Sequence, residues 1–350
     1  MLPKEEPLRA KDEIVTNQAV LTDKETLLRL YGLRENPFAG QFQQELATAA
    51  MIEQLLVQVD GFDHADARLP NWAELPNDKA FSILISGPAR SGRSSAARWV
   101  ALRCAEKLEA LRKARAENVN PPPGDLLQRY LSDHVIKDDH LRIPIRAVLN
   151  KYYQKAARVA DPNDNNFARD ASRWQEASKD EKTQAPDFYS NCFSSFYDAS
   201  SAALGTPIFY FDNVRKYDQI WETAQIISQN AVLIFTTSTE LVTTEFDAAL
   251  ERGDMPGVRL ALDELNPTDV KKFITARWDK FGAPGHRSLI PDNGIQSVFA
   301  EKYPIGAVIR ILGMMLVEYA NDWIEAGKPD NPEEMSEKLM WRCVVKMYRL

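Results

Sequence analysis

The chain has 350 residues, a formal net charge of −7 at pH 7 and a hydrophobic content of 44%. This length and composition suit a folded protein of one large or two medium domains, and no segment approaches the roughly 18 consecutive apolar residues of a membrane span. The acidic balance disfavours a surface built mainly for nucleic acid, because clustered lysine and arginine neutralise a phosphate backbone. A local basic surface, and with it a nucleic-acid partner, stays open. The three cysteines lack metal-ligand spacing, which favours reduced thiols in a cytoplasmic protein.

The first part of the chain is predicted to hold two short helices behind a polar arm. Residues 1–21 are mixed polar and are expected to form a flexible N-terminal arm. A helix capped by Thr22 or Asp23 is expected to end before the segment YGLRENPFAG at 31–40. A second helix is predicted over residues 43–59 from its apolar spacing.

An apolar run, a glycine-containing loop and a helix follow one another from residue 81. The run FSILIS at 81–86 is typical of a strand that is buried on both faces. The next segment, GPARSGRSS at 87–95, has the G-x-x-x-x-G spacing of a phosphate-binding loop. Apolar residues at helical spacing predict a helix that starts near Ser94. Strand, loop and helix together are the context that such a loop requires.

Four more apolar runs are predicted to be strands, at 141–149, 207–213, 231–238 and 259–265. Helical segments separate these runs, and the alternation predicts an α/β fold with a parallel five-stranded sheet flanked by helices. Two segments, at 110–138 and 150–206, exceed what this sheet needs and are predicted to be helical insertions. We expect the α/β domain to cover residues 22–265.

After this domain the pattern becomes helical to the last residue. Asn266 or Thr268 is expected to cap the first of these helices. We therefore predict a helical C-terminal domain over residues 266–350.

The loop offers several groups that bind phosphate. Gly87 and Gly92 let the backbone curl so that successive amides point at an anion, and the following helix adds its positive dipole end. Ser94 stands where a hydroxyl normally coordinates magnesium. Arg93 replaces the usual lysine; it keeps the charge, but its planar fork needs more room, so binding is expected to survive better than phosphoryl transfer. A plain strand-to-helix turn is the alternative.

Two later strand ends supply further candidates. IFYFDN ends in Asp212, which is predicted to hold magnesium through water, and Asn213 stands where active hydrolases commonly carry an acid. An amide does not accept a proton from water near neutral pH, so hydrolysis is expected to be weak. LIFTTSTE presents Thr236, Thr237 or Ser238 toward a phosphate, and ordinary strand-ending hydroxyls are the alternative.

Two arginines lie further along the chain, at Arg252 and Arg259. In an oligomer, an arginine from one subunit can stabilise phosphate charge in the site of its neighbour. From the two strand ends and this pair of arginines, the catalytic candidates are Asn213, Thr237 and Arg252.

Together these segments resemble the AAA+ class of P-loop ATPases, in particular the bacterial branch that contains the ExeA-type secretion ATPases, the TniB and TnsC transposition regulators and origin-recognition-type proteins. The residues that carry the resemblance are YGLRENPF, GPARSGRSS, IFYFDN, LIFTTSTE and LALDELNPTDVKKFITARW. The resemblance implies that ATP or ADP binds with Mg²⁺, that the helical C-terminal domain forms a lid, and that Arg310 in GAVIR contacts the nucleotide. The residues implied to bind nucleotide are Gly87, Pro88, Ala89, Arg90, Ser91, Gly92, Arg93, Ser94, Ser95 and Arg310, and those implied to hold the metal ion are Ser94 and Asp212.

Arg93 and Asn213 depart from the motifs of that class, and three functions follow. The first is a nucleotide-responsive switch or assembly module of a multi-protein complex, with weak or absent ATP hydrolysis. The second is an active ATPase of the transposition or replication type that acts on DNA or remodels a protein partner. The third is an inactive scaffold with an empty site. The first hypothesis accounts for the retained fold elements and the altered catalytic groups together, and it implies protein partners and self-association.

Overall fold

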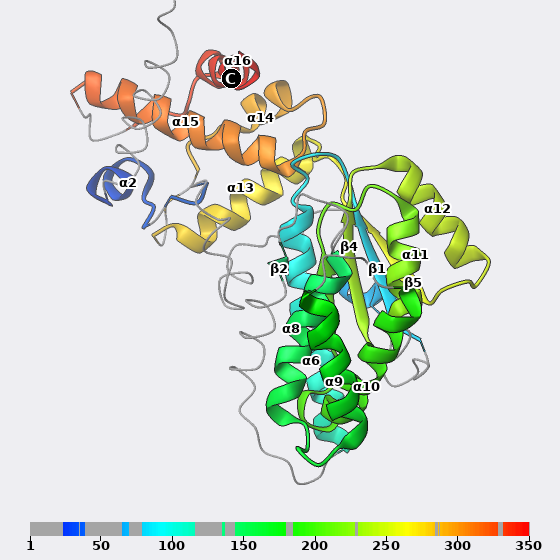
Figure 1. Cartoon of the computed structure of the whole chain (residues 1–350). Helices are drawn as coiled ribbons and strands as arrows, with labels where there is room; N and C mark the ends of the chain where they lie inside the picture. Colours follow the sequence, from blue (N-terminus) through cyan, green and yellow to red (C-terminus); the bar gives the residue numbers. More distant parts are fainter. Residues whose placement is uncertain are drawn as a thin grey trace, which may run out of the picture.

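The structure is a computed structural model that describes residues 24–34, 36–38, 65–69, 79–115, 135–136, 144–179, 185–227, 230–283, 286, 288–327 and 332–349. The predicted arm over 1–21, the predicted helix over 43–59 and most of the insertion over 110–138 lie outside these residues. The described chain forms an α/β part and a group of C-terminal helices (Figure 1). Within this described part, no helix combines the length and apolarity needed to cross a membrane.

A parallel sheet forms the centre of the α/β part. Its strands are β1 (Phe81–Ser86), β2 (Val135–Ile136), β3 (Ile208–Phe211), β4 (Val232–Thr237) and β5 (Gly257–Ala261), in the order β2-β3-β4-β1-β5. Four strands form the body of the sheet, and the two-residue β2 pairs with β3 at one edge. Every residue of β1, β3 and β4 is buried, which explains why these strands are unbroken apolar runs in the sequence. The predicted parallel α/β arrangement is confirmed.

One predicted strand is wrong. The sequence predicts a strand over 141–149, but the helix α8 (Pro144–Val159) begins inside this segment. Pro144 is the first residue of the helix, where its fixed φ is favourable and its missing N–H costs no hydrogen bond. Leu149 and Tyr152 are both buried on α8, so the apolar run is the inner face of a helix. Short apolar runs fit a buried helix as well as a buried strand.

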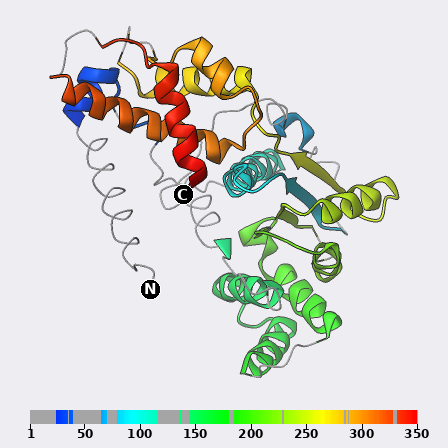
Figure 2. The same ribbon diagram turned by 90° about the horizontal axis from the view of Figure 1, so that it is seen from above.

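Helices cover the sheet on both faces, and the side chains of each strand alternate between them. Ile83 and Ile85 of β1 belong to a core that includes the apolar side of α6 (Arg93–Arg115). Leu84 of β1 and Phe235 of β4 belong to a second core on the opposite face. The helices of that face are α8, α10 (Pro186–Leu204), α11 (Tyr217–Ile226) and α12 (Glu240–Glu251). Figure 2 shows α6 and the group of α8 and α10 on opposite sides of the strands.

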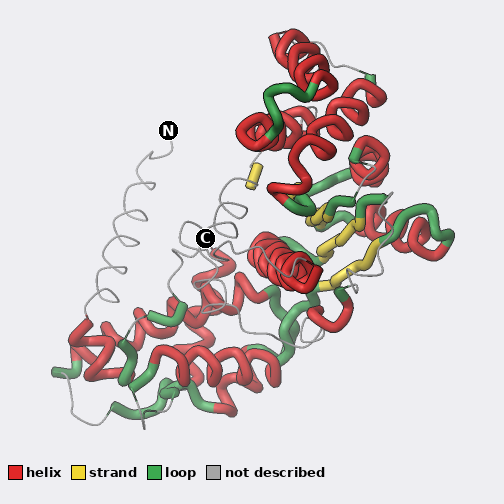
Figure 3. Tube along the Cα trace, turned by 90° about the horizontal axis from the view of Figure 1, so that it is seen from below, coloured by secondary structure: helices red, strands yellow, loops and turns green. Residues whose placement is uncertain are grey.

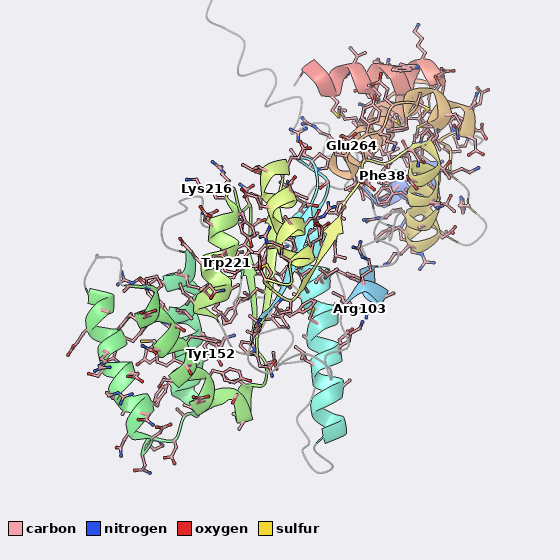
Figure 4. The ribbon with its side chains drawn as sticks, turned by 90° about the vertical axis from the view of Figure 1, so that its right-hand side faces the viewer. Phe38, Arg103, Tyr152, Lys216, Trp221 and Glu264 are labelled. Atoms are coloured by element: carbon pink, nitrogen blue, oxygen red, sulfur yellow. The ribbon has the colours of Figure 1, made fainter. Side chains whose placement is uncertain are left out.

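The predicted insertion over 150–206 is a helical extension of this second face. It contains most of α8, together with α9 (Asn165–Lys179) and α10, and Figure 3 shows these helices as a group beyond the sheet. The three helices pack around aromatic rings, namely Tyr152, Tyr153, Phe167, Trp174, Phe188, Tyr189, Phe193 and Phe196. The hydroxyl of Tyr152, labelled in Figure 4, lies 3.1 Å from Ser200 Oγ. The polar end of this buried ring is therefore hydrogen-bonded.

Four helices lie in the described part of the chain after Asn266. They are α13 (Pro267–Phe281), α14 (Asp292–Val298), α15 (Ile305–Glu325) and α16 (Glu337–Arg349). Asn266 caps α13, because its Oδ1 accepts a hydrogen bond from the Asp269 amide at 3.0 Å and the Asp269 carboxylate accepts one from the Asn266 amide at 3.2 Å. Of the two predicted caps, Asn266 is thus the one that forms the reciprocal capping pair.

The segment YGLRENPF lies with these C-terminal helices, although it precedes the sheet in the sequence. The helix α2 (Lys24–Tyr31) ends at Tyr31, whose hydroxyl donates to the backbone carbonyl of Leu316 in α15. The Tyr31 ring meets Trp278 of α13 edge-on. Phe38, labelled in Figure 4, also packs near Trp278, with ring centroids 6.4 Å apart. Residues from both sides of the α/β sequence therefore build one helical unit.

We expect Tyr31→Phe to lower the free energy of unfolding by about 1 kcal/mol, because a buried hydrogen bond is lost while the ring contacts stay. Urea denaturation measures this change. Tyr319→Phe is the matched control, since its hydroxyl donates to the Glu333 carbonyl at an exposed position, where water replaces the lost bond. Equal losses in the two variants would contradict a stabilising role for the buried Tyr31 bond.

Candidate functional site

A tight turn joins β1 to α6. A Cβ atom on Gly87 would come within 2.7 Å of both the Leu262 carbonyl oxygen and the Ser91 hydroxyl oxygen. Gly92 has a φ of 84°, which residues with side chains disfavour. The Ala96 amide donates to the Gly92 carbonyl at 2.9 Å, so the free amides of the first helical turn border the loop. The backbone therefore requires both glycines, and the turn leads directly into a helix N-terminus.

The other predicted loop residues follow the same turn. The Ser91 amide donates to the Pro88 carbonyl at 3.2 Å, and Ala89 is exposed at the tip. Ser95 is half-buried in the first turn of α6. These residues contribute mainly backbone groups, which is what binding of an anion by a loop requires.

The strand β4 lies between β1 and β3 and aligns their ends. Ser86 at the end of β1 pairs with Thr237, and Phe211 at the end of β3 pairs with Phe235. Asp212, the residue after β3, is therefore level with Thr236. The loop, the end of β4 and Asp212 meet at one edge of the sheet.

Two hydroxyl groups hold the Asp212 carboxylate. Ser94 Oγ donates to Asp212 Oδ2 at 3.2 Å, so the structure brings the predicted metal-binding pair together. Thr236 Oγ1 donates to Asp212 Oδ1 and accepts a hydrogen bond from the Asn213 amide at 2.7 Å. The carboxylate thus connects the first turn of α6 to the ends of β3 and β4.

Thr236, one residue before the catalytic candidate Thr237, contacts Asp212. The Thr237 hydroxyl donates to the Val214 carbonyl at 2.7 Å and accepts from the Thr239 amide at 3.1 Å. Strand side chains alternate between the two faces of a sheet. Thr236 shares its face with Ile234, which packs in the same core as α6. Thr236 therefore points to the sheet face covered by α6, where Asp212 lies, and Thr237 points to the opposite face. Knowing which face α6 covers would have distinguished the two threonines.

Arg93 folds back over the loop. Its Nη1 atom donates to the Gly87 carbonyl at 2.6 Å. Burial lowers the pKa of Arg93, and the negative charge of Asp212 opposes this effect. The guanidinium stays protonated, because arginine is not deprotonated in proteins. A positive charge is thus held at the loop by the loop's own backbone.

Asn213 follows Asp212 on a turned backbone. Its φ is 56°, in the left-handed region that asparagine tolerates better than most residues. Its side chain is exposed. The position where an acid would act on an attacking water therefore carries an amide.

Tyr210 is a residue of the site that the sequence analysis missed. It lies on β3 two residues before Asp212 and is buried. Burial, and secondarily the charge of Asp212, raises the pKa of Tyr210, so its hydroxyl stays protonated. The run IFYF predicts a buried strand, but it does not show that the Tyr210 hydroxyl faces the loop.

The N-terminus of α15 touches the loop from the helical unit. The Gly306 amide donates to the Arg90 carbonyl at 2.8 Å, and Arg90 has a φ of 67°. A Cβ atom on Gly306 would lie 2.7 Å from that carbonyl oxygen. Arg310 is exposed one turn further along α15. The helix predicted to supply a nucleotide-contacting arginine is thus the helix that meets the loop.

The two candidate arginines after β4 have partners of their own. Arg252 lies at the exposed end of α12, and its Nε atom pairs with Asp254 Oδ2 at 2.7 Å. Arg259 of β5 pairs with Asp247 Oδ1 at 2.9 Å, and its Nη1 lies 3.4 Å from Ser86 Oγ. Of the two, Arg259 is the one that the structure brings to the end of β1.

The oxygen ligands at this edge fit magnesium bound together with phosphate. Mg²⁺ prefers oxygen ligands and is commonly held by one or two carboxylates, waters and substrate phosphates. Ser94 Oγ and the Asp212 carboxylate supply such oxygens side by side. No cluster of three or more His, Cys, Asp or Glu side chains capable of holding a metal ion occurs among the described residues. The two side-chain oxygens of Ser94 and Asp212 leave room in the coordination of a metal ion for waters and phosphate oxygens.

Comparison with known proteins gives limited likeness. No family model matches the chain, and no curated protein matches it. Among solved structures, the chain is similar to the Aeropyrum pernix ORC2 protein, described as ADPNP–ADP complexes, with a TM-score of 0.40 and 9% identity. The match covers 77% of this chain and 63% of that one, so the chain spans less than two thirds of that protein. We therefore base the function on the geometry of the site itself.

We expect Gly306→Ala to lower the melting temperature, because the added Cβ meets the Arg90 carbonyl and separates α15 from the loop. A decrease equivalent to about 1–3 kcal/mol is typical of such overpacking. Gly313→Ala in the same helix is the matched control. Its added Cβ would meet only ordinary contacts, the nearest at 3.4 Å, so the higher helix propensity of alanine should leave stability unchanged or raise it. A similar effect of both substitutions would argue against the contact between α15 and the loop.

Proposed function

We propose that this chain is an AAA+-like nucleotide-binding protein that binds ATP or ADP with Mg²⁺ and acts as a switch or assembly module. The observation that carries the proposal is the 3.2 Å hydrogen bond from Ser94 to Asp212, at the edge where the glycine loop enters α6. A strand-to-helix turn without a ligand has no need for a carboxylate from a second strand at this point. The supporting features are the two required glycines and the helix N-terminus.

Each group then has a distinct task. The amides of Ala89, Arg90 and Gly92 in the loop, together with those of the first turn of α6, bind the phosphates. Ser94 and Asp212 hold Mg²⁺, which neutralises phosphate charge and orients the phosphates when it is bound. Thr236 keeps the Asp212 carboxylate oriented through its hydrogen bond to Oδ1.

Weak or absent hydrolysis follows from two residues. Asn213 cannot take a proton from an attacking water near neutral pH. Arg93 carries a broad planar charge where a compact one normally sits between phosphates, and it donates to the Gly87 carbonyl. Both changes act on the transfer step more than on binding, because loop amides and Mg²⁺ supply most contacts to a bound phosphate.

The contact of α15 with the loop supports a role as a switch. The Gly306 amide donates to the Arg90 carbonyl at 2.8 Å. A bound phosphate that changes the conformation of the loop would therefore also change its contact with the N-terminus of α15. The insertion of α8, α9 and α10 adds a surface that the site does not use, and we assign partner binding to it. Self-association would allow the exposed Arg252 to reach the site of a neighbouring copy.

We expect Mg·ATP to raise the melting temperature of the wild-type protein. Ligand at a hundredfold excess over its dissociation constant stabilises a protein by about 2.7 kcal/mol. Ser94→Ala and Asp212→Asn should each reduce the shift, because each removes an oxygen from the metal position. Differential scanning fluorimetry of protein freed of bound nucleotide measures the shift.

Ser172→Ala is the control for the loss of a serine, since Ser172 is exposed on α9, away from the loop. It should retain the full shift. If wild-type protein shows no shift with millimolar Mg·ATP, the proposed nucleotide site is wrong, and the result favours the inactive scaffold with an empty site.

We also expect turnover to depend on Arg93 and Asn213 together. Wild-type protein and the Arg93→Lys variant should both hydrolyse ATP at a rate near background. In both proteins residue 213 is asparagine, which cannot act as a general base. Adding Asn213→Glu to Arg93→Lys should raise the rate, by roughly a hundredfold if the carboxylate acts as a general base. Phosphate release at saturating ATP measures turnover. Rapid hydrolysis by the wild-type protein would contradict this assignment and favour the active ATPase.

A further inference from the structure

Tyr210 is a polar residue in an otherwise apolar strand. Its neighbours on β3 are Phe209 and Phe211, and its own ring belongs to the core that contains the apolar side of α6. Only 5% of the residue is exposed. A phenylalanine would fill the same space without bringing a hydroxyl into the core.

The Tyr210 hydroxyl lies near the candidate metal ligands Ser94 and Asp212. Because strand side chains alternate, Tyr210 and Asp212 emerge on the same face of β3. Burial, the charge of Asp212 and weak hydrogen bonding with Ser94 and Asp212 all affect the pKa of Tyr210, so its hydroxyl lies close to both side chains. Yet no hydrogen bond of ordinary geometry joins it to a group in the described part of the chain. The buried Tyr210 hydroxyl, which can both donate and accept a hydrogen bond, thus lies beside Ser94 and Asp212. It makes no hydrogen bond of ordinary geometry with the described residues.

A buried hydroxyl without a full partner is unfavourable, so its presence indicates a partner that arrives from outside. The groups around it select the partner. Hydrated Mg²⁺ usually keeps several of its waters, and such waters are strong hydrogen-bond donors. A phenolic hydroxyl can accept one hydrogen bond from such a water and donate another to a carboxylate.

We propose that Tyr210 is a positioning residue for the nucleotide-bound Mg²⁺, whose hydration shell it contacts through its hydroxyl beside Ser94 and Asp212. This inference rests on the proposed nucleotide site and adds to it a second sphere of contact from β3. It assigns Tyr210 to the metal ion and not to the nucleotide base or sugar. Tyr210 should therefore matter only when Mg²⁺ and nucleotide are both present.

Tyr210→Phe separates this role from core packing, because the ring remains. Without ligand, the variant should melt at the same or a higher temperature than the wild type, since a buried hydroxyl is removed. With ADP fixed at saturation, the Mg²⁺ concentration that gives half of the stabilisation should rise roughly three- to tenfold, the value of one hydrogen bond. With ADP and EDTA, variant and wild type should show equal shifts.

Tyr217→Phe is the matched control. The Tyr217 hydroxyl also lacks a hydrogen-bond partner among the described residues, but its ring packs on the opposite core with α11. This variant should keep the Mg²⁺ dependence of the wild type. Titration of Mg²⁺ into the protein–ADP mixture, followed by calorimetry, gives a second readout that does not depend on melting.

The outcomes distinguish the inference from the proposed function. If wild-type protein responds to Mg·ADP and Tyr210→Phe has the same Mg²⁺ dependence, the role of Tyr210 is wrong while the nucleotide site stands. A large loss of stability in ligand-free Tyr210→Phe also overturns the role, because the hydroxyl then already has a partner within the protein. No response of the wild type to any nucleotide overturns the site and the inference together.

Discussion

The position of β4 between β1 and β3 is the constraint on which the site depends. The Gly87 amide donates to the Thr237 carbonyl at 3.2 Å, which fixes the start of the loop against β4. Thr236, one residue earlier, turns its hydroxyl to Asp212 on the other side of the strand. A slip of one residue in this register would turn Thr236 to the opposite face and remove the hydroxyl from the carboxylate. The strand pairing therefore sets the chemistry at the sheet edge.

The same sheet face joins the site to the rest of the molecule. One continuous core runs from Ile83 and Ile85 of β1 through α6 to Phe273 of α13 and Ile311 of α15. Protein interiors are packed as densely as organic crystals and do not deform smoothly. A change in the loop therefore has two paths to the helical unit, through the packed core below α6 and through the direct contact with α15. The helices of the opposite face pack in a separate, largely aromatic core.

The sequence was most informative where local pattern decides structure. A buried apolar strand, two glycines and a helix start together predict the turn at 87–95, and Asp212 follows from its place at a strand end. The strand predicted over residues 141–149 was wrong, because an apolar run that contains Pro144 fits the start of a helix as well as an edge strand. The choice of Thr236 over Thr237 needed the face that carries α6, and the packing of Tyr31 against α15 is a long-range contact. These features arise from tertiary structure, which a local pattern does not contain.

For the proposed function, the contact of Arg93 with Gly87 gives a physical reason why nucleotide would bind while hydrolysis would be weak. The guanidinium keeps its charge after burial, so the loop still attracts phosphate. Binding then exchanges one hydrogen bond to a carbonyl for stronger bonds to an anion, and a neutral bond contributes only about 1 kcal/mol net. That cost is small beside the gain from several loop amides and a metal ion. Phosphoryl transfer instead requires charge placed within a narrow geometry between two phosphates, and a planar fork tied to the backbone does not supply it. Under the proposed function, arginine in place of lysine would therefore separate the recognition of nucleotide from its hydrolysis.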